Sequence, residues 1–173
     1  PQGLQGETGP TGPAGPAGPQ GPAGLITDSN LNTKGGTGSL FSVTTGLRNV
    51  AVGSDALRST TSGSSNVALG DSALRNNSSG FDNVAIGQSA LGGNTVAGQN
   101  TAIGTGALAA YNALSGGSTA IGYAALGSSV TAAGNTAVGW KALNRSTGSL
   151  NTALGFGALE VNVSGSLNTA VGN

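Results

Sequence analysis

The segment Asn100-Thr101-Ala102-Ile103-Gly104-Thr105-Gly106-Ala107-Leu108 decides the fold, because its pattern recurs along the chain. The pattern is Asn, Thr or Val, Ala, an aliphatic residue, Gly, two variable residues, Ala and Leu. Eight copies follow one another every 16 to 18 residues, and the last copy is incomplete. So regular a period is typical of a solenoid, in which each coil buries its apolar groups only when a neighbouring coil stacks on it. The copies begin at Asn49, Asn66, Asn83, Asn100, Ser118, Asn135, Asn151 and Asn168.

The first five residues of each copy predict a short strand with alternating faces. One face carries Asn, Ala and Gly, and the other carries Thr or Val and the aliphatic residue. Either face is compatible with the interior. Coils stacked about 4.8 Å apart place like residues in columns, so the aliphatic residues form one ladder. The Ala-Leu pairs, from Ala56-Leu57 to Ala158-Leu159, are expected to form a second ladder on a return strand.

The Asn that opens each copy is expected to form a structural ladder, in which stacked side chains hydrogen-bond from one coil to the next. The Gly at the fifth position is expected at a turn, where a positive φ or a close backbone approach excludes a Cβ. The predicted Asn ladder comprises Asn49, Asn66, Asn83, Asn100, Asn135, Asn151 and Asn168.

The first 24 residues follow a different period, because Gly occupies every third position from Gly3 to Gly24. Five of these glycines are followed directly by Pro. This is the Gly-X-Y signature of a collagen triple helix, in which only Gly fits at the axis. A triple helix needs three chains, so the sequence predicts a homotrimer.

Counting one period back from Asn49 leads to Asn32, where a degenerate copy runs to Leu40. A degenerate first coil suits the exposed end of a solenoid. The predicted organisation is therefore a collagen-like segment at 1–24, a collar at 25–31, a capping coil at 32–48 and the β-roll repeats at 49–173.

Composition argues against several functional classes. Charged residues make up 7% of the chain and aromatic residues 3%, and the net charge is zero. Nucleic acid is not an expected partner, because its binding requires clustered Lys and Arg. The chain has no Cys and no His, and no apolar run approaches the roughly 20 residues of a membrane span. We expect no enzymatic activity, no catalytic or metal-binding residues and no cofactor.

At the Asn-Thr-Ala-Ile-Gly segments the chain resembles the heads of trimeric autotransporter adhesins, the YadA-like family. Similar repeats also resemble those of collagen-bearing surface or tail fibres of phages, bacteria and large viruses. The resemblance covers 49–173 and implies an all-β, left-handed parallel β-roll, a β-solenoid of 17-residue coils that is homotrimeric. The chain departs from the adhesin pattern in its longer period and in the collagen-like segment.

Two functions follow from these features. One is a structural part of a trimeric extracellular fibre or filament that serves attachment, located on a cell or virion surface. The alternative is an adhesin or phage-type tail fibre that recognises a host glycan or surface protein. The expected partners are two further copies of the chain, with end-to-end fibre assembly as an open question, and a host receptor in the alternative. No membrane segment is expected within 1–173.

One column of residues breaks the repeat. The residue after the turn Gly is polar in the early coils and aromatic in three later ones, Tyr123, Trp140 and Phe156. Flat aromatic faces bind sugars, and aromatic residues are enriched at interfaces. The column is therefore either a ligand platform or a packing and trimer contact. Asp55 and Asp71 lie in neighbouring turns, where they either reach one cation or lie solvated beside Arg58 and Arg75.

Overall fold

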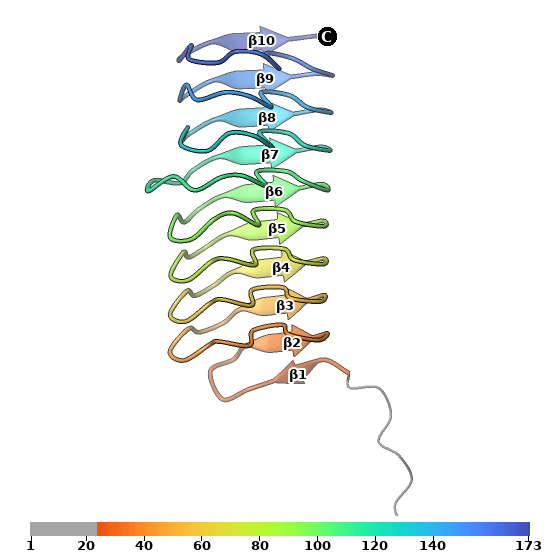
Figure 1. Cartoon of the computed structure of the whole chain (residues 1–173), viewed down its shortest axis with the longest axis vertical. Helices are drawn as coiled ribbons and strands as arrows, with labels where there is room; N and C mark the ends of the chain where they lie inside the picture. Colours follow the sequence, from red (N-terminus) through yellow and green to blue (C-terminus); the bar gives the residue numbers. More distant parts are fainter. Residues whose placement is uncertain (1–23) are drawn as a thin grey trace, which may run out of the picture.

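The computed structural model describes residues 24–173, which form a single ten-stranded sheet wound as a β-solenoid (Figure 1). The predicted collagen triple helix lies outside the described residues. The sheet order follows the chain without crossovers. The strands are β1 (Ile26–Thr27), β2 (Thr33–Gly35), β3 (Val50–Val52), β4 (Val67–Leu69), β5 (Val84–Ile86), β6 (Thr101–Ile103), β7 (Thr119–Ile121), β8 (Thr136–Val138), β9 (Thr152–Leu154) and β10 (Thr169–Val171).

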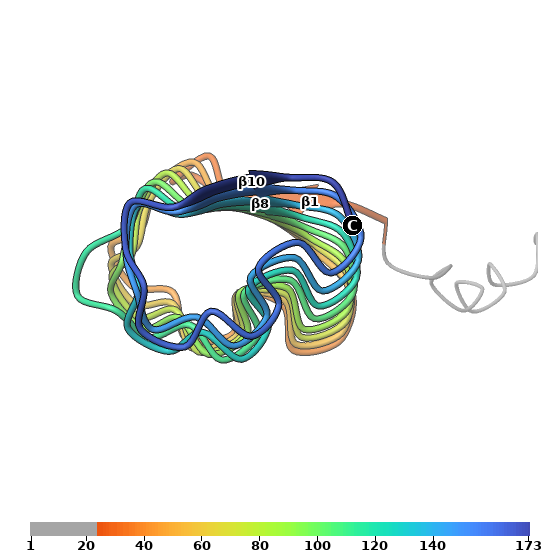
Figure 2. The same ribbon diagram turned by 90° about the horizontal axis from the view of Figure 1, so that it is seen from above.

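Neighbouring strands from β2 to β10 pair in parallel and in the register that the repeats predict. Ala85 pairs with Ala102, and Ala102 pairs with Ala120. The register tolerates the irregular spacings, because β8 still pairs with β9 one residue short of the usual period. Each coil therefore contributes one three-residue strand to a flat wall, and Figure 2 shows the coils superposed along the solenoid axis.

The structure places the small side chains inside the solenoid and the aliphatic ladder outside. Asn100 and Ala102 are fully buried, whereas Thr101 and Ile103 face outward and are half-buried. The Ala side chains of the strands and the Asn amides are thus part of the interior. A ladder of Val, Leu and Ile thus runs along the outer face of the wall.

The predicted return strand is wrong, because the Ala-Leu pairs lie on consecutive turns. Both residues of each pair are buried in most coils. The second apolar ladder is therefore present, but turns rather than strands carry it. The Leu takes a left-handed conformation, with φ of 50° at Leu57 and 51° at Leu108. This backbone costs roughly 1–2 kcal/mol, which burial of a Leu side chain offsets with about 1.5–3 kcal/mol. Successive turns let a 17-residue coil close around a thin core.

The Gly at the end of each strand allows two coils to approach. Gly104 has a φ of 126°, and a Cβ built there would lie 2.6 Å from the carbonyl oxygen of Gly122. A side chain at this position would therefore separate neighbouring coils.

The N-terminal end of the solenoid is closed by polar groups and by β1, which pairs antiparallel with β2. Lys34 occupies the slot that holds a buried Ala in later coils. Asp28 accepts hydrogen bonds from the backbone N–H groups of Asn30 and Asn32, both at 2.9 Å. The bond from the Asn32 N–H is the main reason that the pKa of Asp28 is lowered. These contacts tie the β1–β2 turn down over the open end.

Candidate functional site

The Asn side chains hydrogen-bond from coil to coil, except around Ser118 and Asn135, where backbone N–H groups make the links. In the regular coils the side-chain Nδ2 donates both to the Oδ1 of the previous Asn and to a carbonyl in the segment that leads into the next strand. Asn83 donates to Asn66 Oδ1 at 3.0 Å and to Ala97 O at 3.0 Å, and its own Oδ1 accepts from Asn100 Nδ2 at 3.1 Å. The ladder therefore ties each strand to the previous coil and to the segment that leads into the next strand, and has a structural role.

The aromatic column lies outside the solenoid, at the corner where the chain leaves the strands. Tyr123, Trp140 and Phe156 are 54%, 38% and 58% exposed. The rings of Trp140 and Phe156 stack with centroids 4.5 Å apart and planes 7° apart, and those of Tyr123 and Trp140 lie 6.4 Å and 14° apart. Lys141 Nζ lies 4.3 Å from the Trp140 ring centroid. Trp140 thus has a neighbouring ring on each side, whereas Tyr123 and Phe156 at the ends of the column each have one.

This geometry bears on the sugar-platform hypothesis. Aromatic residues that bind sugars do so through an open ring face, whereas here both neighbours of Trp140 occupy its faces. Edges remain free along the column, and edges suit van der Waals contact with another side chain. The stacking favours the packing or contact interpretation over a flat ligand platform.

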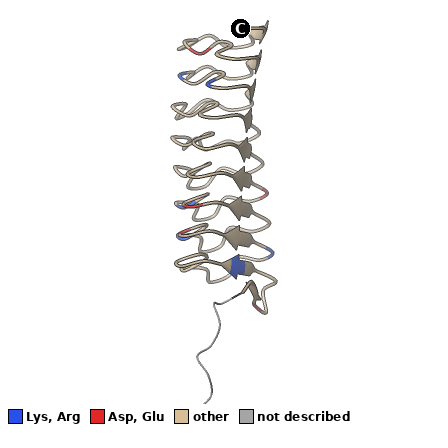
Figure 3. Ribbon diagram, turned by 90° about the vertical axis from the view of Figure 1, so that its right-hand side faces the viewer, with Lys and Arg blue, Asp and Glu red and all other residues tan. Residues whose placement is uncertain are grey.

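The outer face of the sheet is a second candidate surface, and it carries no charged residue from β3 to β10. Figure 3 shows the charged residues of these coils outside the strands, on the turns and bends between them. Val occupies the first outward position in β3 to β5 and Thr occupies it from β6 onward. Ile86, Ile121 and Leu154 are exposed on this face. At the N-terminal end the Leu25 side chain lies over Gly35, so it continues the ladder where the strand itself lacks a side chain.

One coil departs from the others, and the sequence interpretation missed its importance. Between β6 and β7 the coil is longer, and residues 112–117 project sideways from the solenoid (Figures 1 and 2). Leu114 at its tip is 92% exposed, while Tyr111 at its base is fully buried. The Tyr111 hydroxyl donates to Ser115 O at 2.5 Å. Burial raises the pKa of Tyr111, and a hydrogen bond with Ser118 opposes that rise.

Tyr111 interrupts a second buried column, whose members in the adjacent coils are Asn94 and Ser129. Asn94 donates to Asn77 Oδ1 at 2.9 Å, but its own Oδ1 has no partner, and neither has Ser129 Oγ. Both unpartnered atoms thus belong to the coils on either side of Tyr111. Ser118 replaces the ladder Asn in the same region, which leaves space for the larger phenol. The 18-residue spacing and Ser118 were the sequence signals of this rearrangement.

The charged groups and pockets offer no assembled catalytic chemistry among residues 24–173. Asp55 lies 3.2 Å from Arg58 and 3.7 Å from Arg75, so the two Arg residues share one carboxylate. No group of three or more His, Cys, Asp or Glu side chains that could hold a metal ion occurs in this range, and no helix in it is long and apolar enough to span a membrane.

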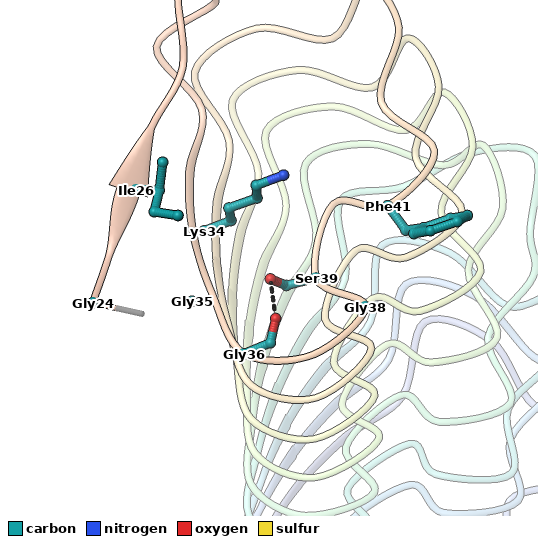
Figure 4. A pocket seen from close by; sticks show the side chains of 8 residues that line it. All are labelled: Gly24, Ile26, Lys34, Gly35, Gly36, Gly38, Ser39 and Phe41. Carbon is teal, nitrogen blue, oxygen red and sulfur yellow. Dashed lines mark hydrogen bonds between the residues drawn. The ribbon is translucent and has the colours of Figure 1, made fainter. Parts of the chain in front are cut away.

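A shallow pocket of about 240 Å³ lies at the N-terminal end (Figure 4). Lys34 is the only titratable side chain that lines it, and Ser39 Oγ donates to Gly36 O at 2.9 Å. A second pocket, of about 280 Å³, has Arg75 as its only charged lining residue. Neither pocket pairs an acid with a base.

No protein-family model, no curated protein and no solved structure matches this chain.

Proposed function

We propose that the protein is a structural part of a trimeric extracellular fibre, in which the solenoid forms a stiff rod and the Gly-X-Y segment forms a stalk. The observation that carries the proposal is the uncharged outer face of the sheet, which presents Val, Ile, Leu and Thr along the whole rod. A continuous face of this kind, without Lys, Glu or Asp, is typical of an interface.

The proposal assigns this face to the three-fold axis. Three copies with their solenoid axes parallel to that axis would cover one another's aliphatic ladders. The same axis would gather the three Gly-X-Y segments at one end of the rod, since Gly24 lies two residues before β1, the strand that caps the sheet. This arrangement would align three Gly-X-Y segments in register, which a triple helix of only eight triplets needs.

The mass of the chain in solution tests the proposal. We expect a trimer for residues 1–173 and for residues 25–173, because the sheet face drives association. A monomer in both cases would overturn it. Ile86→Lys together with Ile103→Lys should give a folded monomer of 25–173, since each trimer would bury six ammonium groups. Val96→Lys and Ala110→Lys are matched controls, at exposed positions of the same coils outside the strands.

The protruding loop favours a second candidate function, recognition of a host surface molecule. A binding site needs a position that differs from the repeat, and residues 112–117 supply one with an exposed Leu114 on a buried Tyr111 anchor. Binding of the trimer to host cells that is lost on Leu114→Ser, and kept on Val130→Ser, would support recognition. Equal binding by the two variants would exclude the loop as the recognition site.

A further inference from the structure

Two columns of residues border the outer sheet face, one at each end of the strands. We define the entry corner as the residue before each inward Asn or Ser, and the exit corner as the residue after each strand-terminal Gly. The residues of both corners face solvent, with the small Gly134 half-buried. From β3 to β9 the entry corner comprises Arg48, Ser65, Asp82, Gln99, Gly117, Gly134 and Leu150, and the exit corner comprises Ser54, Asp71, Gln88, Thr105, Tyr123, Trp140 and Phe156.

Both corners change from polar to nonpolar residues at the same strand, β7. In β3 to β6 both corners are polar or charged. In β7 and β8 the exit corner carries Tyr123 and Trp140, while the entry corner carries only Gly117 and Gly134. At β9 Phe156 on the exit corner has Leu150 on the entry corner, and Leu167 follows at β10. A strand with a polar residue at one corner thus has a polar residue at the other, and a strand with an aromatic ring at the exit corner has Gly or Leu at the entry corner.

Within one chain the matched residues cannot meet. Leu150 and Phe156 lie at opposite ends of β9 (Figure 1), and the extended residues between them span roughly 13 Å or more. The match is therefore not explained by packing inside the solenoid. Leu150 is 59% exposed and Leu167 is 77% exposed, so both apolar side chains lack cover in the single chain.

Rotation symmetry brings the two corners together. If the sheet faces surround a three-fold axis parallel to the solenoid, the entry corner of one copy adjoins the exit corner of the next. A rotation about that axis leaves the height of every residue unchanged, so β9 of one copy meets β9 of its neighbour. The entry-corner and exit-corner residues of the same strand, which match in character, are therefore the ones that the three-fold rotation would place side by side.

We propose that the aromatic column of one copy packs against the Gly and Leu residues of the entry corner of the next copy. The stacked rings offer their edges outward, Gly117 leaves open space for Tyr123, and Leu150, whose side chain lies over Gly134, meets Trp140 and Phe156. The Leu150 side chain already leans toward β8, because its Cδ2 lies 2.9 Å from the place where a Cβ on Gly134 would be. This inference rests on the trimer of the proposed function and names the contact that fixes the register of its subunits.

Disulfide trapping tests the contact, and the chain has no native Cys to interfere. The whole chain, residues 1–173, with Leu150→Cys and Phe156→Cys should yield a covalent trimer under mild oxidation, seen after denaturation without reductant. The control combines Phe156→Cys with Arg48→Cys, which lies on the same entry corner six coils away, about 29 Å along the axis. This control should remain unlinked, since a disulfide needs Cα atoms within roughly 7 Å.

The outcomes separate the inference from the function on which it rests. A non-covalent trimer in which the Leu150/Phe156 pair fails to cross-link, or cross-links no better than the control, would overturn the corner contact and leave the trimer standing. A monomer under reducing conditions would overturn both the corner contact and the proposed trimer. A second measurement uses Trp140→Ala, which should weaken trimer association at least tenfold in sedimentation, whereas Gln88→Ala on the same corner should change it less than threefold. Equal effects would also overturn the contact.

Discussion

At the residue scale, the Asn at the start of each coil is the most constrained side chain in the molecule. It is fully buried in the regular coils, and its amide has both donors and an acceptor engaged. A buried amide is tolerated only when its groups are bonded. Ser118 shows the alternative, because its shorter side chain keeps one bond, accepted by Ser118 Oγ from the Asn135 N–H at 3.3 Å.

Replacing Asn83 by Ala should lower the free energy of unfolding by about 3–5 kcal/mol, because four hydrogen bonds of its side chain are lost and their buried partners stay unpaired. Denaturant unfolding at fixed protein concentration measures this effect. The control is Asn76→Ala, an exposed Asn in the preceding coil that should change stability by no more than about 0.5 kcal/mol. Similar losses in the two variants would contradict the role of the ladder.

Tyr111 gives a pH dependence of known sign. Its pKa is raised by burial, so the neutral phenol is favoured in the folded state. Its contribution to stability is complete below the unfolded pKa of about 10 and is lost as pH rises through the raised folded value. The stability of Tyr111→Phe should therefore fall less steeply than that of the parent chain as the pH rises above about 10. Thermal melts across this range test it, and parallel curves for the two proteins would contradict the assignment.

At the element scale, a coil consists of one short strand and a series of tight turns rather than two strands. Leu residues at positive φ and the strand-terminal Gly allow these turns, and each turn donates hydrogen bonds to the next coil. Leu91 N donates to Ala107 O at 2.9 Å, for example. The coil is thus stabilised by its neighbours on every side, which explains how three-residue strands suffice.

Gly104→Ala should destabilise the solenoid by at least about 2 kcal/mol, because the new methyl group would meet the Gly122 carbonyl and the residue would keep a φ of 126°. Gly106→Ala is the matched control, since that Gly also has a positive φ, of 70°, and an added Cβ would meet only Ala124 Cα, at 3.9 Å. It should cost about 1 kcal/mol. Chemical denaturation of both variants distinguishes backbone crowding from conformational strain, and equal costs would refute the crowding.

At the scale of the whole molecule, the solenoid is quasi-one-dimensional, because every strand contacts only its sequence neighbours in the sheet. Stability in such a fold is nearly a sum over coils and their interfaces. The molecule can therefore lose or gain a whole coil without a change in the remaining ones.

Deletion of residues 67–83 removes one period and joins Asn66 directly to Val84, which restores the repeat. We expect a folded rod shorter by about 4.8 Å. Deletion of 67–75 should prevent cooperative folding of the rod, because it shifts Asn and Leu out of their columns. Small-angle scattering and thermal melts measure both, and equal behaviour of the two deletions would contradict the column model.

The sequence by itself determined the coils, their register and their ladders. A fixed period forces equivalent residues into columns, so the Asn ladder and the pairing of Ala85 with Ala102 followed from counting. The Gly turns followed from the same period, which also assigns Tyr123, Trp140 and Phe156 to one column.

Only the tertiary structure decided which face is inside and what replaces the return strand. Alternation in a strand defines two faces but does not say which one the rest of the coil covers, and a wall of tight turns leaves room for Ala102 but not for Ile103. The stacking angle of the rings, the Tyr111 anchor and the alignment of Leu150 with Phe156 across a strand depend on how the coil closes. Closure is a property of all 17 residues together, and no local pattern contains it.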